Sequence, residues 1–336
     1  MIPSFQAYSG ALQSLSLGSH AAVTDIQGVL EDFGRCLHSG GLTDRPVRDF
    51  LSLLNVAPIA SRFGPAVAEA ALAYLGVQRE ALDLTIERKI GQGCASEVFL
   101  AHETESRRPV ALKVYRPFQK AVREDEVPMR GLFNELRFQA AIGDRAVARV
   151  LRCGLTAGAN PYLGLEYLPE GSLADVVSSL AKSGEPYGPR DQHLAAGALA
   201  AASAVHGAGI VHGDMSIENF LVGLGGGVKL ADFAMARRLS EPSYSFEGRG
   251  KFKEPEGLAY DVFQLGKVLY RIFTRHPYDI SDMTVRRAPV PGKKRPDLRI
   301  PSWVDEMVTR SLSASPTESF SDAAAMRDFF LEHASG

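Results

Sequence analysis

The sequence has few cysteines and no long hydrophobic run. Its three cysteines, Cys36, Cys94 and Cys153, are odd in number and far apart, which argues against a disulfide framework or a cysteine-based zinc site. No apolar run reaches the roughly 18 residues that suggest a membrane span. The N-terminus has neither the basic flank nor the apolar core of a secretory signal. These absences predict a cytoplasmic protein in a reducing compartment.

Charge of either sign is also not in excess. The 336 residues carry a formal net charge of −2, so a general binder of nucleic acid or another polyanion is not expected. The length is enough for about two domains. The apolar and charged fractions are those of an ordinary globular protein.

The first 82 residues contain no recognisable chemistry. Residues 1–24 are rich in serine and almost uncharged, which favours a flexible terminus. The alternative is an export signal for a contact-dependent bacterial secretion system. Residues 25–80 then place apolar side chains at the i, i+3, i+4, i+7 spacing of a helix. We expect a short helical extension that packs on the following domain or binds a partner.

At residue 84 the pattern becomes alternating. Residues 84–103 predict a strand, a glycine-rich turn and a second strand. Gly91 and Gly93 allow the backbone of that turn to approach a phosphate without a Cβ in the way. The next predicted strand, PVALKVY, contains Lys113 within an apolar run. A lysine at such a position is unfavourable unless it is paired.

Residues 210–234 carry two carboxylates and one carboxamide at fixed spacing: Asp214, Asn219 and Asp232. Between Asn219 and Asp232, residues 220–231 predict a strand, a glycine-rich hairpin and a return strand. The hairpin brings the two oxygen-bearing ends back to the same edge of a small sheet. Hard oxygen ligands in that arrangement suit Mg²⁺ carrying a polyphosphate.

This stretch resembles the catalytic and metal-binding loops of the protein kinase superfamily. The family pattern H-R-D-L-x-x-x-N reads here as HGDMSIEN, and D-F-G reads as DFA. Glycine-rich loop, lysine, glutamate, aspartate, asparagine and second aspartate follow in the family's order, which chance turn residues would rarely produce. The resemblance covers about residues 84–332 and is to bacterial eukaryotic-like serine/threonine protein kinases.

The resemblance implies an α+β, bilobal protein kinase-like fold. We expect a kinase domain over residues 83–335, with a small β-rich N-lobe at 83–168 and a helical C-lobe at 169–335. Residues 1–82 are expected to form the N-terminal flexible segment and helical extension.

By resemblance, five residues carry the reaction. Lys113 binds the α- and β-phosphates of ATP and pairs with a glutamate on the next helix, for which Glu135 is the candidate. Asp214 accepts or orients the proton of the substrate hydroxyl, so Asp214 and Lys113 are the predicted catalytic residues. Asn219 and Asp232 hold Mg²⁺, with Mn²⁺ as the alternative metal, and this ion bridges the phosphate oxygens.

The other ATP contacts are assigned to the glycine-rich loop, the adenine pocket and the hinge between the lobes. Leu165 falls at the position that controls access behind the adenine. Glu166 to Leu168 offer backbone groups to the adenine edge. The full set of predicted ATP-binding residues is Gly91, Gln92, Gly93, Ser96, Val98, Ala111, Lys113, Glu135, Leu165, Glu166, Leu168 and Leu221.

Several residues near the catalytic loop are assigned packing roles. His206 is interpreted as a packing or capping histidine rather than a catalytic one. His212 is expected to hold the catalytic loop against Phe233. In the helix that follows the activation segment, Asp261 is expected to cap the backbone of the catalytic loop, and Gly266 to permit close packing.

Three positions depart from the family pattern. Gly213 replaces an arginine that in many kinases pairs with a phosphorylated activation loop, so we predict activity that does not depend on loop phosphorylation. Ser216 replaces a lysine that contacts phosphate, and Lys251 or Lys253 are candidate substitutes. Ala234 has less backbone freedom than the family's glycine.

Two packing positions also differ. Gln139, four residues after Glu135, stands where the family usually has an apolar side chain, which predicts an unusual helix position. Glu256 is expected to lack its usual buried arginine partner, because Ser319 occupies that position.

The implied reaction is Mg-ATP-dependent transfer of the γ-phosphoryl group to Ser or Thr of a protein substrate. One alternative is a pseudokinase scaffold, motivated by Gly213, Ser216 and Ala234. The other is a kinase for a small molecule such as an inositol, a lipid headgroup or a sugar, motivated by HGD. The later Pro-Glu pair and the helix within YDVFQLGKVLYRIFTRHPY favour a protein substrate.

Residues 285–299 form a basic, proline-rich loop, VRRAPVPGKKRPDLR. A charge run of this kind is usually a solvated face. Docking of an acidic partner or an anionic lipid is the alternative.

Overall fold

The structure is a computed structural model that describes most of the kinase-like region. The described residues are 83–93, 96–115, 131, 134–135, 138–139, 142, 145–155, 161–240, 257–276, 290–313, 315 and 317–334. Outside them lie the predictions for residues 1–82, for Lys251, Lys253 and Glu256, and for residues 285–289 of the basic loop.

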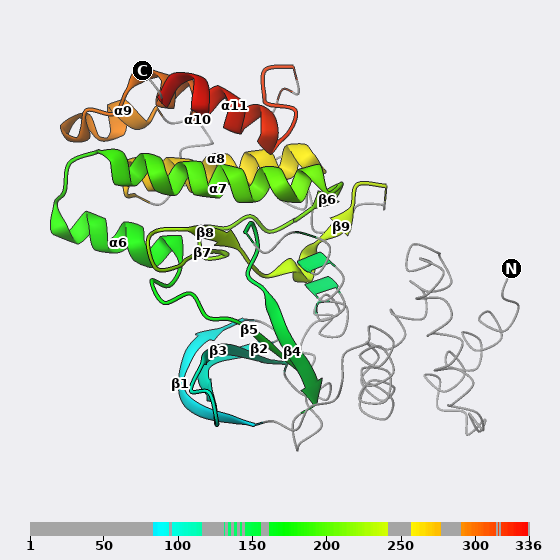
Figure 1. Cartoon of the computed structure of the whole chain (residues 1–336). Coiled ribbons are helices and arrows are strands. Elements are labelled where there is room, and N and C mark those ends of the chain that lie inside the picture. Colours follow the sequence, from blue (N-terminus) through cyan, green and yellow to red (C-terminus); the bar gives the residue numbers. More distant parts are fainter. Residues whose placement is uncertain are drawn as a thin grey trace, which may run out of the picture. The chain divides into compact units, whose positions relative to one another are not determined.

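The chain divides into two compact units (Figure 1). The first runs to Leu136 and includes Val150–Tyr167, and the second contains Arg137–Arg149 and Leu168–Gly336. The first unit contains a five-stranded sheet, and the second contains every long helix among the described residues. A β-rich lobe and a helical lobe are the α+β, bilobal architecture that the resemblance implies.

The sheet of the first unit is antiparallel throughout, in the strand order β1-β2-β3-β5-β4. The alternating apolar pattern predicts β1 to β3, and the run PYLGLE predicts β5. β4 has no comparable signal, because Arg152 and Gly154 interrupt its apolar residues. The strand bounds are β1 Leu84–Gln92, β2 Ser96–Glu103, β3 Pro109–Tyr115, β4 Val150–Leu155 and β5 Pro161–Glu166.

One face of this sheet packs a small hydrophobic core. Ala101, Leu112 and Tyr162 are buried together, and Phe99 and Val114 pack against them. These residues come from β2, β3 and β5 and lie on one face because strand residues alternate in direction. The opposite face is therefore the one available to the predicted nucleotide-binding residues.

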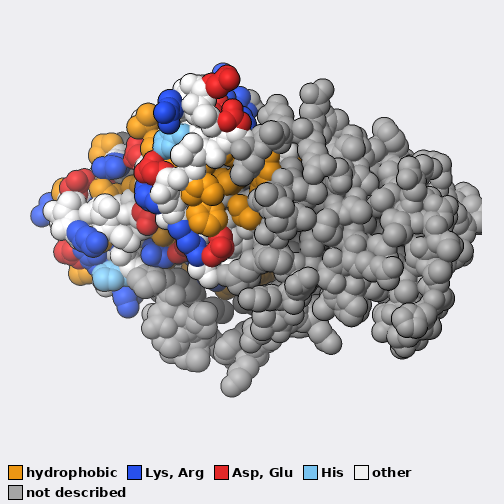
Figure 2. Space-filling model, turned by 90° about the horizontal axis from the view of Figure 1, so that it is seen from below, with side chains coloured by type: hydrophobic (Ala, Val, Ile, Leu, Met, Phe, Trp, Pro, Cys, Tyr) orange, Lys and Arg blue, Asp and Glu red, His pale blue; other side chains and the backbone are white. Residues whose placement is uncertain are grey.

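β1 is a mostly exposed strand. Ile86 is 50% exposed, and the neighbouring Glu87 and Arg88 side chains are 50% and 57% exposed. Basic, acidic and hydrophobic side chains are interspersed on the described part of the face in Figure 2. Such a mixed surface agrees with the small net charge of the chain.

The second unit combines helices with two short two-stranded sheets. α7 runs beside α8, and α10 and α11 pack on this pair (Figure 1). The helices are α6 Leu173–Ser183, α7 Pro189–Gly207, α8 Leu258–Thr274, α9 Pro291–Lys294, α10 Ser302–Ser311 and α11 Ala323–Ala334, with 3-10 turns η3 Phe233–Met235 and η5 Pro296–Leu298. The short sheets pair β6 Ile210–Val211 with β9 Arg237–Arg238, and β7 Phe220–Val222 with β8 Val228–Leu230.

Local sequence explains where α6 begins and how α8 packs. Ser172 caps α6 by accepting a hydrogen bond from the backbone of Asp175, and the Asp175 side chain accepts one from the Ser172 backbone. Gly266 in α8 faces α10, where a Cβ would lie 2.9 Å from Cβ of Ser311. The predicted close packing at Gly266 is confirmed. No helix in the described ranges is long and apolar enough to cross a bilayer.

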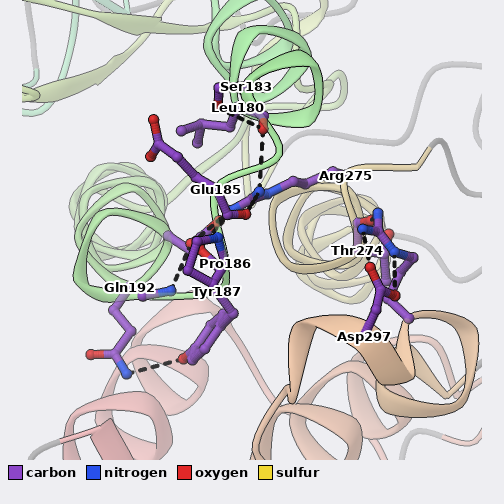
Figure 3. A network of polar contacts seen from close by, with 12 residues as sticks. Leu180, Ser183, Glu185, Pro186, Tyr187, Gln192, Thr274, Arg275 and Asp297 are labelled. Atoms are coloured by element: carbon purple, nitrogen blue, oxygen red, sulfur yellow. Dashed lines mark hydrogen bonds and ion pairs between the residues drawn. The ribbon is translucent and has the colours of Figure 1, made fainter.

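Arg275, the residue after α8, joins three helical segments (Figure 3). Its Nη2 lies 3.1 Å and 3.2 Å from the two carboxylate oxygens of Asp191 at the start of α7. Its guanidinium also donates to the backbone carbonyls of Leu180, Glu185 and Pro186. The side chains of Arg275 and Asp191 are 2% and 3% exposed, so this is a buried ion pair with a dense set of acceptors.

Candidate active site

In the first unit, Lys113 is paired as its burial requires. Lys113 is 6% exposed on β3, and its Nζ lies 2.5 Å from Oε1 of Glu135, which is fully buried and helical. The Tyr115 hydroxyl donates to the same oxygen at 2.8 Å. The structure thus joins the lysine to the glutamate that the sequence offers as its partner. A charge-assisted hydrogen bond of this kind offsets the cost of burying both groups.

The predicted nucleotide residues of β1 to β5 largely share one face of the sheet. Gly91 lies opposite Val98, and Val98 lies opposite Lys113. Ala111, two residues before Lys113, lies opposite Leu165. Since directly opposed residues point to the same side, these five residues form an apolar surface with one amine.

The turn between β1 and β2 is closed by its own backbone. The Gly93 N–H donates to the Ser96 carbonyl at 2.9 Å, and Ser96 is 5% exposed. Gln92 is exposed, and its Oε1 accepts from Lys89 at 2.7 Å. Glu166 lies opposite Val110, so its side chain lies on the other face from Leu165.

In the second unit, Asn219 fixes Asp214. Asn219 Nδ2 donates to Oδ2 of Asp214 at 2.9 Å and to the Asp214 carbonyl at 2.8 Å. Backbone bonds from Ser216 to Asp214 and from Asn219 to Ser216 close the turn between them. Asn219 therefore holds Asp214 through both a side-chain oxygen and the main-chain oxygen of the aspartate.

Asn219 and Asp232 lie at the same end of a hairpin. Asn219 directly precedes β7, Phe220 pairs with Leu230, and the Ala231 N–H donates to the Asn219 carbonyl at 2.8 Å. Asp232 is the next residue, and it has a left-handed backbone with φ of 62°. The hairpin geometry that the sequence predicts is present, with β8 ending at Leu230.

His212 connects the two loops of the site. Its Nδ1 accepts from the Asp214 N–H at 3.3 Å, so Nε2 carries the proton and donates to the Ala231 carbonyl at 3.2 Å. Its ring meets Phe233 edge to face, with 4.8 Å between centroids. The predicted packing of His212 on Phe233 is confirmed.

Asp261 anchors the catalytic loop from α8. Its carboxylate is fully buried and accepts from the backbone N–H groups of His212 and Gly213 at 2.6 Å and 2.8 Å. His206 Nε2 donates to it at 3.1 Å, and His206 Nδ1 accepts from the N–H of Ala323 at the start of α11. Both sequence predictions are confirmed: Asp261 caps the loop, and His206 is a packing and capping residue.

The acidic groups of the second unit influence one another. Burial is the main cause that raises the pKa of Asp214, and the neighbouring Asp232 raises it further, against the opposing effects of His212 and Asn219. A divalent cation between such carboxylates would relieve their repulsion. The oxygens of Asn219 and Asp232 are the hard donors that Mg²⁺ prefers. Within the described ranges no cluster of three or more His, Cys, Asp or Glu side chains forms a metal site, so an ion here would need oxygens from phosphate or water.

The backbone explains two of the three departures from the kinase pattern. Gly213 has φ of +76°, and a Cβ there would lie 2.9 Å from the Met235 carbonyl. Ala234 lies within the 3-10 turn η3, where a left-handed backbone is not required. Gln139, which stands where the family usually has an apolar side chain, is 4% exposed and donates to the Ala148 carbonyl at 3.1 Å.

The second unit also carries the remaining predicted adenine residues. Leu168 is buried with Ala148 and Ala231, and Leu221 packs against these three. The Leu221 backbone forms a bridge with Ser172, next to the start of α6. Leu168 and Leu221 therefore belong to one apolar cluster of the second unit.

Three polar side chains of α8 that lie beside the catalytic loop are not predicted by the sequence analysis. A pocket of about 260 Å³ is lined by residues 215–218 of that loop and by Gln264, Lys267 and Arg271 of α8, among others. The spacing of 264, 267 and 271 places them on one helical face. This spacing is a signal, but nothing in the sequence alone connects that face to the catalytic loop.

The fold and these two groups of residues define a class of protein, the bilobal kinases. A family model described as the protein kinase domain matches residues 84–305. The chain therefore belongs to the protein kinase domain family.

The relatives are bacterial serine/threonine-protein kinases. The chain is similar to serine/threonine-protein kinase PknB of Mycolicibacterium smegmatis, with 30% identity over 262 residues, which are 71% of this chain and 41% of that protein. PknB of Mycobacterium leprae is 28% identical over 74% of this chain and 42% of its own length. PknL of Mycobacterium tuberculosis strain H37Rv is 28% identical over 72% of this chain and 63% of its own length. The chain thus spans about two-fifths of the PknB relatives and under two-thirds of PknL.

Proposed function

We propose that this chain is an ATP:protein phosphotransferase that transfers the γ-phosphoryl group of Mg-ATP to Ser or Thr of a protein substrate. The observation that carries the proposal is the buried Lys113–Glu135 pair at 2.5 Å. A buried amine with one carboxylate partner and an apolar surface beside it suits a nucleotide polyphosphate. The membership of the protein kinase family and the names of its relatives support Ser or Thr as the acceptor.

The residues of the second unit take the other roles. Mg-ATP, when bound, supplies the γ-phosphoryl group and the cation that offsets charge on its oxygens. Asn219 and Asp232 hold the metal, and Asp214 orients the acceptor hydroxyl and takes its proton. The new bond joins the hydroxyl oxygen to the γ-phosphorus, and the bond from that phosphorus to the β,γ-bridging oxygen breaks to release ADP.

We also propose that activity does not depend on phosphorylation of the activation segment. Gly213 offers no cation to a phosphate, and Asp261 already holds its N–H at 2.8 Å. We expect the variants Ser240→Ala, Ser243→Ala and Ser245→Ala to retain transfer activity in a radiolabelled-ATP assay. Loss of activity in any of them that phosphomimetic Asp restores would contradict this proposal.

A further proposal concerns the basic loop. Lys293 and Lys294 are exposed in α9, whereas Arg295 pairs with Asp297 at 2.6 Å and donates to the Thr274 carbonyl. The two exposed lysines are the candidate contacts for an acidic partner, and Arg295 serves the local fold.

The proposed function is tested by incubating the full chain with radiolabelled ATP, Mg²⁺ and a bacterial protein extract, beside Asp214→Ala. The expected result is label on protein, as phosphoserine or phosphothreonine, with the wild type only. No transfer with retained Mg-ATP binding would favour the pseudokinase scaffold. Label only on a metabolite would favour a small-molecule kinase.

A further inference from the structure

The pocket beside the catalytic loop has a wall that belongs to the site itself. Met215, Ser216, Ile217 and Glu218 line it and follow directly after Asp214. The Ser216 N–H donates to the Asp214 carbonyl at 2.9 Å. The same turn therefore holds Asp214 and shapes the pocket.

In the part of the chain that the structure describes, two cations and one carboxylate line the pocket. Arg271 Nη1 lies 3.0 Å from Oε1 of Glu218, and their side chains are 26% and 59% exposed. Lys267 Nζ donates to Oε1 of Gln264 at 2.6 Å and lies 5.4 Å from the centre of the Phe263 ring. Lys267 and Arg271 together outweigh Glu218 by one positive charge.

We propose that this pocket binds an acidic side chain of the protein substrate and so selects Ser or Thr acceptors that have Asp or Glu nearby. This inference rests on the proposed function. An acceptor hydroxyl at Asp214 brings neighbouring residues over the turn at 215–218, because an extended peptide advances about 3.3 Å per residue. The acidic residue is therefore expected within about three positions of the acceptor.

The opposite preference, for a basic side chain, is disfavoured by the position of Arg271. Among the described residues that line the pocket, Glu218 is the one carboxylate, and the Arg271 guanidinium already lies against it. A lysine or arginine of the substrate would have to displace Arg271 and would meet Lys267. A carboxylate instead finds two partly exposed cations, of which the guanidinium carries five N–H donors.

Transfer assays on paired peptides test the preference. Each pair has one Ser and differs only by Asp or Ala at a single position within three residues of that Ser. We expect the ratio of kcat/KM for Asp over Ala to reach about tenfold at one position, as for a hydrogen bond to a charged group. In the double variant Lys267→Gln with Arg271→Gln the ratio should fall to about one. In the control Lys182→Gln with Arg190→Gln, which removes the same charge from another surface, the ratio should persist.

Binding separates this inference from the proposed function. Fluorescence anisotropy measures the binding of the Asp peptides, labelled with a dye, whether or not phosphate is transferred. The Asp peptide that binds the wild type most tightly is then compared among the three proteins. We expect about tenfold weaker binding by the Lys267→Gln, Arg271→Gln variant than by the wild type and the control. Equal binding by all three proteins, or a wild-type preference for Lys or Arg at these positions, would overturn the inference. Binding without transfer would overturn the proposed function alone.

Discussion

At the scale of single residues, Gly213 shows why the catalytic loop reads HGD. Its positive φ disfavours any residue with a Cβ, and its Cβ position is 2.9 Å from the Met235 carbonyl. The arginine of the common family pattern would meet both costs here. The departure is therefore built into the backbone of this loop, whose N–H Asp261 also holds.

A left-handed backbone alone is expected to cost an alanine about 1–2 kcal/mol. We predict that Gly213→Ala lowers the free energy of unfolding by more than this amount. Gly184 is the matched control, because it has φ of +68° and nothing within 4 Å of its Cβ position. Urea unfolding measures both variants. Equal losses for Gly213→Ala and Gly184→Ala would show that the contact with Met235 does not matter.

A second prediction concerns the thiol of Cys153 on β4. Burial raises its pKa to about 12, whereas an unfolded cysteine has a pKa of about 8.5. In the background Cys36→Ser, Cys94→Ser, we expect iodoacetamide at pH 8 to label Cys153 only when urea unfolds the protein. Between about pH 8.5 and 12 the unfolded chain releases a proton that the folded chain keeps, so the free energy of unfolding should fall as pH rises. Rapid labelling of the native protein would contradict this account.

At the scale of elements, the Arg275–Asp191 pair joins the ends of α6, α7 and α8 (Figure 3). Removal of one member of a buried ion pair leaves an uncompensated charge. We predict that Arg275→Met lowers the free energy of unfolding by about 3–5 kcal/mol. Adding Asp191→Asn should restore part of this loss, since the buried charge is then removed.

The control for this prediction is Arg190→Met, in the first turn of α7. Arg190 has a side chain that is 55% exposed and lies 3.8 Å from Glu170. Its replacement should change stability by no more than about 0.5 kcal/mol. A double variant that is less stable than Arg275→Met alone would contradict the buried-charge explanation.

Most elements are predictable where local sequence determines them. The hairpin of β7 and β8 and the cap at Ser172 follow from turn glycines and capping chemistry. The close packing at Gly266 follows from the resemblance of its helix to the corresponding helix of the kinases. β4 and the short β6–β9 pair cannot be predicted in this way, because their residues are too few or too polar to show the alternating pattern of a strand. Arg275 is also missed, since its partners lie 84 to 95 residues away in the chain.

The contacts of the candidate site likewise include some that can be predicted from the sequence and some that cannot. The Lys113–Glu135 contact can be predicted because a buried lysine needs a carboxylate and the family pattern offers one. The contribution of Lys267 and Arg271 cannot, since it depends on how α8 packs beside residues 215–218. The sequence predicts that Lys267 and Arg271 share one face of a helix, but only the tertiary structure shows that this face lies beside residues 215–218.

At the scale of the whole molecule, each compact unit holds one part of the proposed machinery. The first supplies Lys113, Glu135 and the apolar face of the sheet. The second supplies Asp214, Asn219 and Asp232, held by His212 and Asp261. A phosphotransferase needs both, because one set binds the nucleotide and the other directs the acceptor.

The most direct measurement is single-turnover phosphoryl transfer by Asp214→Asn beside the wild type, with Mg-ATP affinity determined for both. If Asp214 directs the acceptor hydroxyl, the transfer rate falls by about 10³-fold, and the Mg-ATP dissociation constant stays within about threefold of the wild-type value. A transfer rate equal to that of the wild type would contradict the account.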